Sequence, residues 1–205
     1  MTIRPFRDWR IRVKLIGLTL FLVLLPLLCV AYLSLDRFGK ALRSAAEQDL
    51  GHLVGNIYAM CKIQQEVIQS QVISAQKIAG AKNEKLMGAL SKGLKQEIFP
   101  SFKDEIKKIK VGETGYVYII DSNGILKLHP AKEGENILHS KDSAGFEYIR
   151  AMTTHALELG EGEIGTIRYP WVNPELGEKK PRQKINKYTY FRPWDWIIAA
   201  GSYEE

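Results

Sequence analysis

The hydrophobic pattern separates a long uncharged run near the N-terminus from a mixed remainder. Residues 15–35 form 21 consecutive positions without a charged side chain, whereas acidic and basic residues are spread through everything that follows. At 1.5 Å per residue this run makes a helix about 31 Å long, which matches a hydrocarbon core of roughly 30 Å. The pattern therefore predicts one transmembrane helix over residues 15–35.

Charged residues beside this run predict its orientation. Residues 1–14 hold five basic side chains and one acidic side chain, and basic flanks stay in the cytoplasm during insertion. We therefore expect a single-pass inner-membrane protein with a cytoplasmic N-terminus. The part from Asp36 onward is expected outside the membrane, in the periplasm of a Gram-negative cell. A cleaved signal peptide is the alternative, but the run exceeds the usual ~7–15 apolar residues and no A-x-A site follows it.

Apolar residues recur at helical intervals after the membrane segment. The first helix is expected to continue out of the membrane without a break to about Ile78. A second helix is predicted over residues 84–97 and a third over residues 102–109, because Pro100 interrupts the pattern between them.

At Val111 the pattern changes to strands. Residues 116–121 are a β-branched and aromatic run, Asn123-Gly124 is a dipeptide favoured in tight hairpin turns, and residues 125–129 return as a second strand. Three more strands are predicted over residues 166–172, 183–191 and 196–203. A helix over residues 143–159 joins the two groups, and residues 173–182 form a loop. Five strands in hairpin order imply an α+β fold, an antiparallel sheet with helices packed on it.

The net charge says little about partners. The whole chain carries +6, but residues 1–35 account for +4 of it, which leaves +2 for residues 36–205. This near-neutral balance gives no support to nucleic-acid binding. Cys29 lies in the predicted membrane span and Cys61 in a predicted helix, so we expect no disulfide between them.

The sequence lacks the common motifs of enzymes and metal sites. It contains no G-x-x-x-x-G-K-[ST], G-x-S-x-G or H-E-x-x-H pattern, and the G-x-G-x-x-G spacing at residues 160–165 precedes a predicted strand instead of opening a helix. The four histidines are too widely spaced for a local metal site, and residues 121–124 resemble a calcium loop in composition but not in ligand spacing. We therefore expect no catalytic residue, no metal and no cofactor.

Strand alternation gathers aromatic and basic side chains on shared faces. The sets that share a face are Tyr116 with Tyr118, Ile167 with Tyr169 and Trp171, and Lys184 with Tyr188 and Tyr190. Phenol, indole and lysine donors, with His129 at a strand end, would meet the charge and lone pairs of a buried carboxylate. The pattern therefore predicts a pocket for a small anion. The alternative is that these aromatics are ordinary core and edge residues of a sheet.

Several short stretches, taken in order, resemble a single Cache domain of the second type. This is the extracytoplasmic sensor module of bacterial chemoreceptors, histidine kinases and cyclases. The matching stretches, which together cover residues 112–205, are Gly115–Asp121, Asn123-Gly124, Leu128–Pro130, Gly134–Asn136, Asp142 with Gly145, Gly160–Gly162, Tyr169–Trp171 with Pro174, Lys184, Phe191–Ile198 and Gly201–Tyr203.

The resemblance implies a long N-terminal helix packed along a PAS-like five-stranded antiparallel sheet, with a pocket that often takes short carboxylates. The ligand-binding residues expected here are Tyr116, Tyr118, His129, Tyr148, Tyr169, Trp171, Lys184 and Tyr188. The family often has tyrosine three residues after the Lys184 position, where this chain has Lys187. Either lysine can therefore be the cation that faces the ligand.

The expected division is a cytoplasmic N-terminus (1–14), a membrane helix (15–35), a long helical region (36–110) and a ligand-binding part (111–205). We expect a non-enzymatic homodimeric sensor that binds a small metabolite for chemotaxis or another form of transmembrane signalling. Such receptors normally continue into a second membrane span and an output domain. The chain is thus expected to be either a fragment or a stand-alone sensor with a separate output protein. The alternative function is a structural dimerisation module without a ligand.

Overall fold

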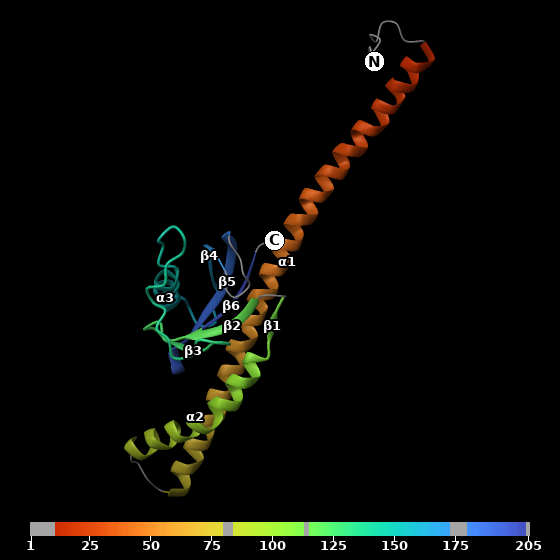
Figure 1. Ribbon diagram of the computed structural model, residues 1–205. Helices are drawn as coiled ribbons and strands as arrows, with labels where there is room; N and C mark the ends of the chain where they lie inside the picture. The colour runs from red at the N-terminus through yellow and green to blue at the C-terminus, as the bar shows by residue number, and fades with distance from the viewer. Residues whose placement is uncertain (1–10, 80–83, 113–114, 173–179, 204–205) are drawn as a thin grey trace. The chain divides into compact units, whose positions relative to one another are not determined.

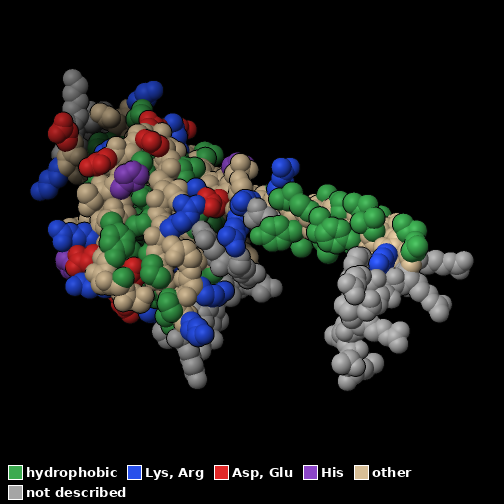
Figure 2. Space-filling view, turned by 90° about the horizontal axis from the view of Figure 1, so that it is seen from above, with side chains coloured by type: hydrophobic (Ala, Val, Ile, Leu, Met, Phe, Trp, Pro, Cys, Tyr) green, Lys and Arg blue, Asp and Glu red, His purple; other side chains and the backbone are tan. Residues whose placement is uncertain are grey.

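The computed structural model describes residues 11–79, 84–112, 115–172 and 180–203. The chain forms two compact units, residues 1–46 and residues 47–205. The described part of the first unit belongs to helix α1 (Ile11–Ala79), whose apolar side chains there are exposed, as Figure 2 shows. Among the described residues, α1 is the helix long and apolar enough to cross a membrane. Most of the expected basic N-terminus lies outside the described residues.

The helical region after residue 46 is simpler than its sequence indicates. Helix α1 is unbroken to Ala79, as expected. The two helices predicted over residues 84–97 and 102–109 are one helix, α2 (Glu84–Lys107), so that prediction was wrong. Pro100 lies inside α2 at a cost of roughly 3 kcal/mol. Burial of Phe102 and Ile106 offsets this cost, because each contributes about 1.5–3 kcal/mol.

One antiparallel sheet follows the helices, which confirms the α+β fold. Its strands are β1 (Lys110–Val111), β2 (Gly115–Ile120), β3 (Leu126–Leu128), β4 (Gly165–Trp171), β5 (Arg182–Phe191) and β6 (Trp196–Tyr203). They run in the order β1-β2-β6-β5-β4, with β3 also paired to β2. The expected count of five strands was one short, because two-residue β1 is too short to show alternation. Of the loop predicted over residues 173–182, residues 173–179 lie outside the described residues.

The predicted hairpin over residues 116–129 is present as β2 and β3. Ile119 pairs with Leu128 and Ile120 pairs with Leu126. The turn between them contains Gly124 at a φ of 79°, a backbone conformation that side-chain-bearing residues rarely adopt. The Asn-Gly signal was therefore sufficient to predict this hairpin.

The sheet separates two hydrophobic cores. Helices α1 and α2 cover one face, and helix α3 (Tyr148–Glu158) covers the other, as Figure 1 shows. The core under α1 and α2 includes Val54, Ile57, Cys61, Ile106, Val117, Ile119, Ile185 and Ile198. The core under α3 includes Tyr118, Ile120, Ile149, Met152, Ala156, Tyr169, Tyr188 and Ile197. Alternate residues of one strand thus enter different cores, as the period of two in a strand requires.

Helix α3 begins later than predicted. The apolar pattern predicted a helix over residues 143–159, but residues 143–147 are not helical. The Asp142 carboxylate accepts hydrogen bonds from the backbone N–H groups of Ala144 and Phe146, at 2.8 and 2.9 Å. Gly145 completes this turn at a φ of 84°. A side chain that hydrogen-bonds to the local backbone competes with a helical turn. The Asp142 carboxylate therefore keeps residues 143–147 out of the helix.

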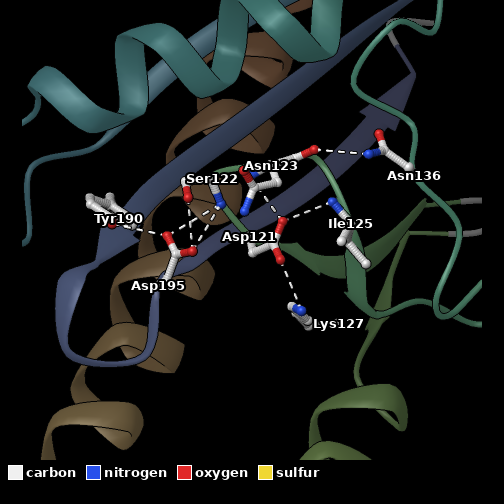
Figure 3. Close-up of polar contacts among 8 residues, drawn as sticks. All are labelled: Asp121, Ser122, Asn123, Ile125, Lys127, Asn136, Tyr190 and Asp195. Atoms are coloured by element: carbon white, nitrogen blue, oxygen red, sulfur yellow. Dashed lines mark hydrogen bonds and ion pairs between the residues drawn. The ribbon is translucent and has the colours of Figure 1, made fainter.

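Asp121 organises the turn between β2 and β3 (Figure 3). Its carboxylate accepts hydrogen bonds from the N–H groups of Asn123 and Ile125, at 3.0 and 2.9 Å, and pairs with Lys127 at 2.9 Å. Burial raises the pKa of this carboxyl, but the Lys127 and backbone hydrogen bonds outweigh burial and hold the pKa below its usual value. Asp121 therefore stays ionised and keeps the turn in one conformation.

Hydrogen bonds to Asp195 join the same turn to the connection between β5 and β6 (Figure 3). Its carboxylate accepts hydrogen bonds from the hydroxyls of Ser122 and Tyr190, at 2.8 and 3.0 Å. Asn136 ties the loop after β3 to this turn by donating to the Asn123 carbonyl at 3.1 Å. These bonds hold in place the loop over residues 129–142, which forms part of the site described next.

Candidate functional site

A small cavity of about 40 Å³ lies between α3 and the sheet. Strands β2, β4 and β5, helix α3 and the loop after β3 all contribute side chains to it. The lining residues are Tyr116, Tyr118, His129, Ile137, Tyr148, Ile149, Tyr169, Trp171 and Lys184. A cavity of this size has room for about three water molecules or for a ligand of a few non-hydrogen atoms.

The phenol groups of the cavity are held as hydrogen-bond donors. Burial raises the pKa of Tyr118 and Tyr169 well above the usual phenol value, and raises that of Tyr148 to about 12. All three phenols therefore keep their protons at neutral pH. The ring of Tyr148 stacks on that of Tyr169, with centroids 3.9 Å apart and planes at 15°. This stacking restricts the rotation of the rings that form one wall.

Lys184 places a cation at the cavity. Its side chain is only 3% exposed, donates to the Tyr116 hydroxyl at 3.3 Å and lies 4.6 Å from the centroid of the Tyr116 ring. Among the described residues, no carboxylate lies within ion-pair distance of it. Desolvation by burial lowers the pKa of Lys184 to about 8. A buried cation without a counter-charge is costly, so an anion in the cavity would stabilise it.

Lys187, the other candidate cation, lies on the opposite face of β5. It donates to the Thr166 hydroxyl at 2.8 Å and pairs with Glu47 of α1 at 3.7 Å. It lies three positions after Lys184, an odd offset, so alternation directs the two side chains to different faces of the sheet. Between the two lysines that the sequence left open, the structure therefore places Lys184, and not Lys187, at the cavity.

His129 meets the cavity from the end of β3. Its Nδ1 accepts hydrogen bonds from the backbone N–H groups of Ala131 and Lys132, both at 3.1 Å. A nitrogen that accepts carries no proton, so the neutral ring has its hydrogen on Nε2. The ring packs edge-on against Tyr116, with centroids 5.0 Å apart.

Tyr188 is the predicted ligand-binding residue that the structure does not bring to the cavity. Its hydroxyl bonds His155 Nδ1 at 2.7 Å, further along the same sheet face. Ile137 was not predicted as a site residue, because it lies in a loop without periodicity. Asn186, which lies behind the cavity on the face of β5 that carries Lys184, was not predicted either. Alternation alone places Asn186 on that face, but an isolated asparagine carries no distinctive signal.

The rest of the described structure offers less chemistry. No group of three His, Cys, Asp or Glu residues within the described ranges is placed to hold a metal ion. A groove of about 310 Å³ between α1 and α2 is lined mainly by Met60, Ile63, Ile98 and Phe102. This groove contains no cation, so the cavity at Lys184 is the better candidate for an anion.

The cost of burying Lys184 should be measurable in the ligand-free protein. Because the pKa is lowered on folding, the unfolded chain keeps this proton when the folded protein has lost it, between about pH 8 and pH 10.5. Wild-type stability should therefore rise through that range. We expect Lys184→Met to be more stable than wild type at pH 7 by up to about 3 kcal/mol, and this difference to shrink toward pH 10.5.

Urea unfolding of the full chain at pH 7 and at pH 10 measures this difference. Lys187→Met, on the other face of the same strand, is the matched control and should show no such stabilisation. A Lys184→Met variant that is less stable than wild type at pH 7 would contradict the assignment of Lys184 as an unpaired buried cation.

Comparison with known proteins identifies similar chains. A methyl-accepting chemotaxis protein, McpP of Pseudomonas putida, is 26% identical over 101 residues. That match covers 48% of this chain and 18% of the relative, so the chain matches less than a fifth of the relative's length.

Solved structures with the same fold include a Cache chemosensory domain described as a structural basis for carboxylic acid recognition. It superposes with a TM-score of 0.53 at 22% identity, over 81% of this chain and 98% of that domain. A methyl-accepting chemotaxis protein of Vibrio parahaemolyticus gives a TM-score of 0.49 at 21% identity, over 83% and 96% of the two chains. Residues 40–205 match the family described as Cache domain. The chain belongs to the Cache domain family.

Proposed function

We propose that the chain is a membrane-anchored, extracytoplasmic sensor domain that binds a short carboxylate for chemotaxis or another form of transmembrane signalling. In this proposal residues 15–35 cross the membrane, residues 36–110 form the helical region and residues 111–205 form the ligand-binding part. No catalytic step is assigned to it. The sensor acts by binding, and a separate output protein or domain receives the signal.

One observation carries the proposal, the unpaired buried cation of Lys184 in a small cavity walled by phenols. A carboxylate in this cavity would supply the missing counter-charge and accept hydrogen bonds from the surrounding O–H groups. The cavity volume of about 40 Å³ favours a ligand with few non-hydrogen atoms. The solved Cache domain with the same fold, described for carboxylic acid recognition, supports this class of ligand.

Strands β4 and β5 offer a route from the cavity to α1. Tyr169 and Lys184 face the cavity, while the neighbouring Arg168 and nearby Lys187 on the other face pair with Glu47 of α1. A ligand that draws β4 and β5 toward α3 would change the strength of the ion pairs that Arg168 and Lys187 make with Glu47. The position of α1 against the sheet would change with them. The signal is then a shift between two packings of α1, of which the ligand stabilises one.

Exposed apolar side chains on α1 support the proposed homodimer. Met60, Ile63 and Val67 recur at intervals of three and four residues, the spacing of a two-helix seam, and each is exposed. The same row is the observation that favours the alternative function, a dimerisation module without a ligand. Ligand binding distinguishes the two functions, because both predict self-association.

Calorimetry of the full chain in lipid nanodiscs, against acetate, propionate, pyruvate and lactate, tests ligand binding. We expect at least one of these anions to bind. Lys184→Met should weaken binding by at least about 30-fold, because it removes one partner of a buried charge pair. Affinity should also fall about tenfold per pH unit above pH 8, as Lys184 loses its proton.

Lys187→Met is again the matched control, and loss of its pair with Glu47 should change affinity by no more than about fivefold. Binding by none of the four anions, or equal binding by wild type and Lys184→Met, would favour the ligand-free dimerisation module instead.

One cysteine variant tests both topology and dimerisation. Ile63→Cys, made with Cys29→Ser, places an exposed thiol on α1, while native Cys61 is fully buried. On intact cells we expect a membrane-impermeant maleimide to label this thiol, and mild oxidation to link two chains. Labelling only after cell lysis would contradict the extracytoplasmic placement. Labelling without any cross-link would contradict the seam on α1.

A further inference from the structure

We infer that the cavity selects a ligand whose polar atoms are all hydrogen-bond acceptors, so that it takes an ionised carboxylate and rejects the matching amide and the matching amino acid. The inference deepens the proposed function and rests on it. Its basis is a set of hydrogen bonds behind the cavity wall, which determine the direction in which each polar group of the wall can donate.

Asn186 sets the direction of two phenols. It is fully buried on β5, and its Nδ2 donates to the hydroxyl oxygens of Tyr118 and Tyr169, at 3.0 and 2.8 Å. A hydroxyl that accepts on one side turns its own proton elsewhere. Asn186 therefore uses both of its N–H groups to turn the two phenol protons away from β5.

The freed phenol protons have weak or no acceptors in the protein. The Tyr118 hydroxyl donates to the sulfur of Met152 at 3.6 Å, a poor acceptor that a carboxylate oxygen would outcompete. Within the described residues, the Tyr169 hydroxyl has Asn186 as its donor and no protein acceptor. Both phenols line the cavity, so they present protons rather than lone pairs to a ligand.

The Asn186 side chain is closely packed behind the wall. Asn186 pairs with Gly201 on β6, and a Cβ atom at Gly201 would collide with the side-chain oxygen Oδ1 of Asn186. That oxygen is buried and has no hydrogen-bond partner among the described residues. The absence of a side chain at position 201 thus makes room for the amide group that orients the phenols.

His129, at another side of the cavity, also has its acceptor atom occupied by N–H donors of the protein. Two backbone N–H groups occupy its Nδ1, so the proton of the neutral ring is on Nε2. The ring can therefore offer a donor but no lone pair. Lys184 adds a cation, which has donors only.

A ligand with an N–H group would find no carboxylate in this wall, and the two phenols that Asn186 orients would present protons to it. None of the described residues that line the cavity is acidic. The N–H groups of an amide would face phenol protons and the Lys184 cation, and an amino acid would place a second cation beside Lys184. Sites that impose an unpaired polar group on the wrong ligand reject it by large factors.

Matched ligands test the selection on the full chain in lipid nanodiscs. The two sets are acetate, acetamide and glycine, and propionate, propionamide and alanine. We expect the amide and the amino acid of a set to bind at least about 100-fold more weakly than the carboxylate. If a carboxylate binds and its amide or amino acid binds within tenfold of it, the inference is overturned while the proposed function stands. If no carboxylate binds, both are overturned.

Asn186→Asp tests the role of the asparagine with almost no change in shape. The new carboxyl accepts protons from the phenols, which turns them away from the cavity and adds a negative charge near Lys184. We expect carboxylate affinity to fall at least about 30-fold and the carboxylate-to-amide ratio to fall with it. A purely structural role would weaken both ligands equally, and that result would overturn the assignment.

Gln183→Glu is the matched control, because it makes the same amide-to-carboxyl change at an exposed position of β5, on the face away from the cavity. Its carboxylate-to-amide ratio should equal that of wild type. Should Asn186→Asp fail to fold, Tyr169→Phe provides the second variant, since it keeps the ring and removes one inward proton. An unchanged ratio in Tyr169→Phe would overturn the inference.

Discussion

The site depends on one constraint, a lysine that folding buries without giving it a counter-charge within the described structure. Lys184 is surrounded by the rings of Tyr116 and Tyr203 and by the sheet, and burial lowers its pKa to about 8. Cation–π contacts offset only part of the cost of removing an ammonium group from water. Burial of Lys184 thus lowers the stability of the ligand-free state, and in the proposed function a small anion in the cavity would offset this cost.

Strands β4 and β5 line the cavity on one face of the sheet and contact α1 on the other. Along β5, Lys184 and Asn186 face α3 and the cavity, while Ile185 and Lys187 face α1. In the proposed mechanism, a change in how β4 and β5 meet the ligand would therefore reach α1 through one layer of backbone. The turn held by Asp121 and Asp195 is bonded through Asn136 to the loop after β3, which forms the other wall of the cavity (Figure 3).

Much of the fold could be predicted from local signals, and the exceptions have physical causes. Alternation located β2, β4, β5 and β6, and Asn123-Gly124 located the hairpin. Tertiary burial of Phe102 and Ile106 overrode the signal of Pro100, and the Asp142 carboxylate delayed the start of α3. The same alternation gathered five of the eight predicted site residues on the cavity face, and the structure adds His129 from the end of β3 and Tyr148 from α3, but alternation cannot show how far along a strand a cavity extends. Tyr188 therefore shares their face without lining the cavity, and Asn186, which orients two of the phenols, carried no signal of its own.

The most direct measurement is the NMR titration of the Lys184 ammonium group in the full chain, with and without saturating acetate or propionate. The account predicts a pKa of about 8 in the ligand-free protein, which rises toward the usual lysine value of 10.5 when the anion is bound. A ligand-free pKa already near 10.5, or a pKa that neither anion changes, would contradict the claim that this buried cation is the centre of an anion site.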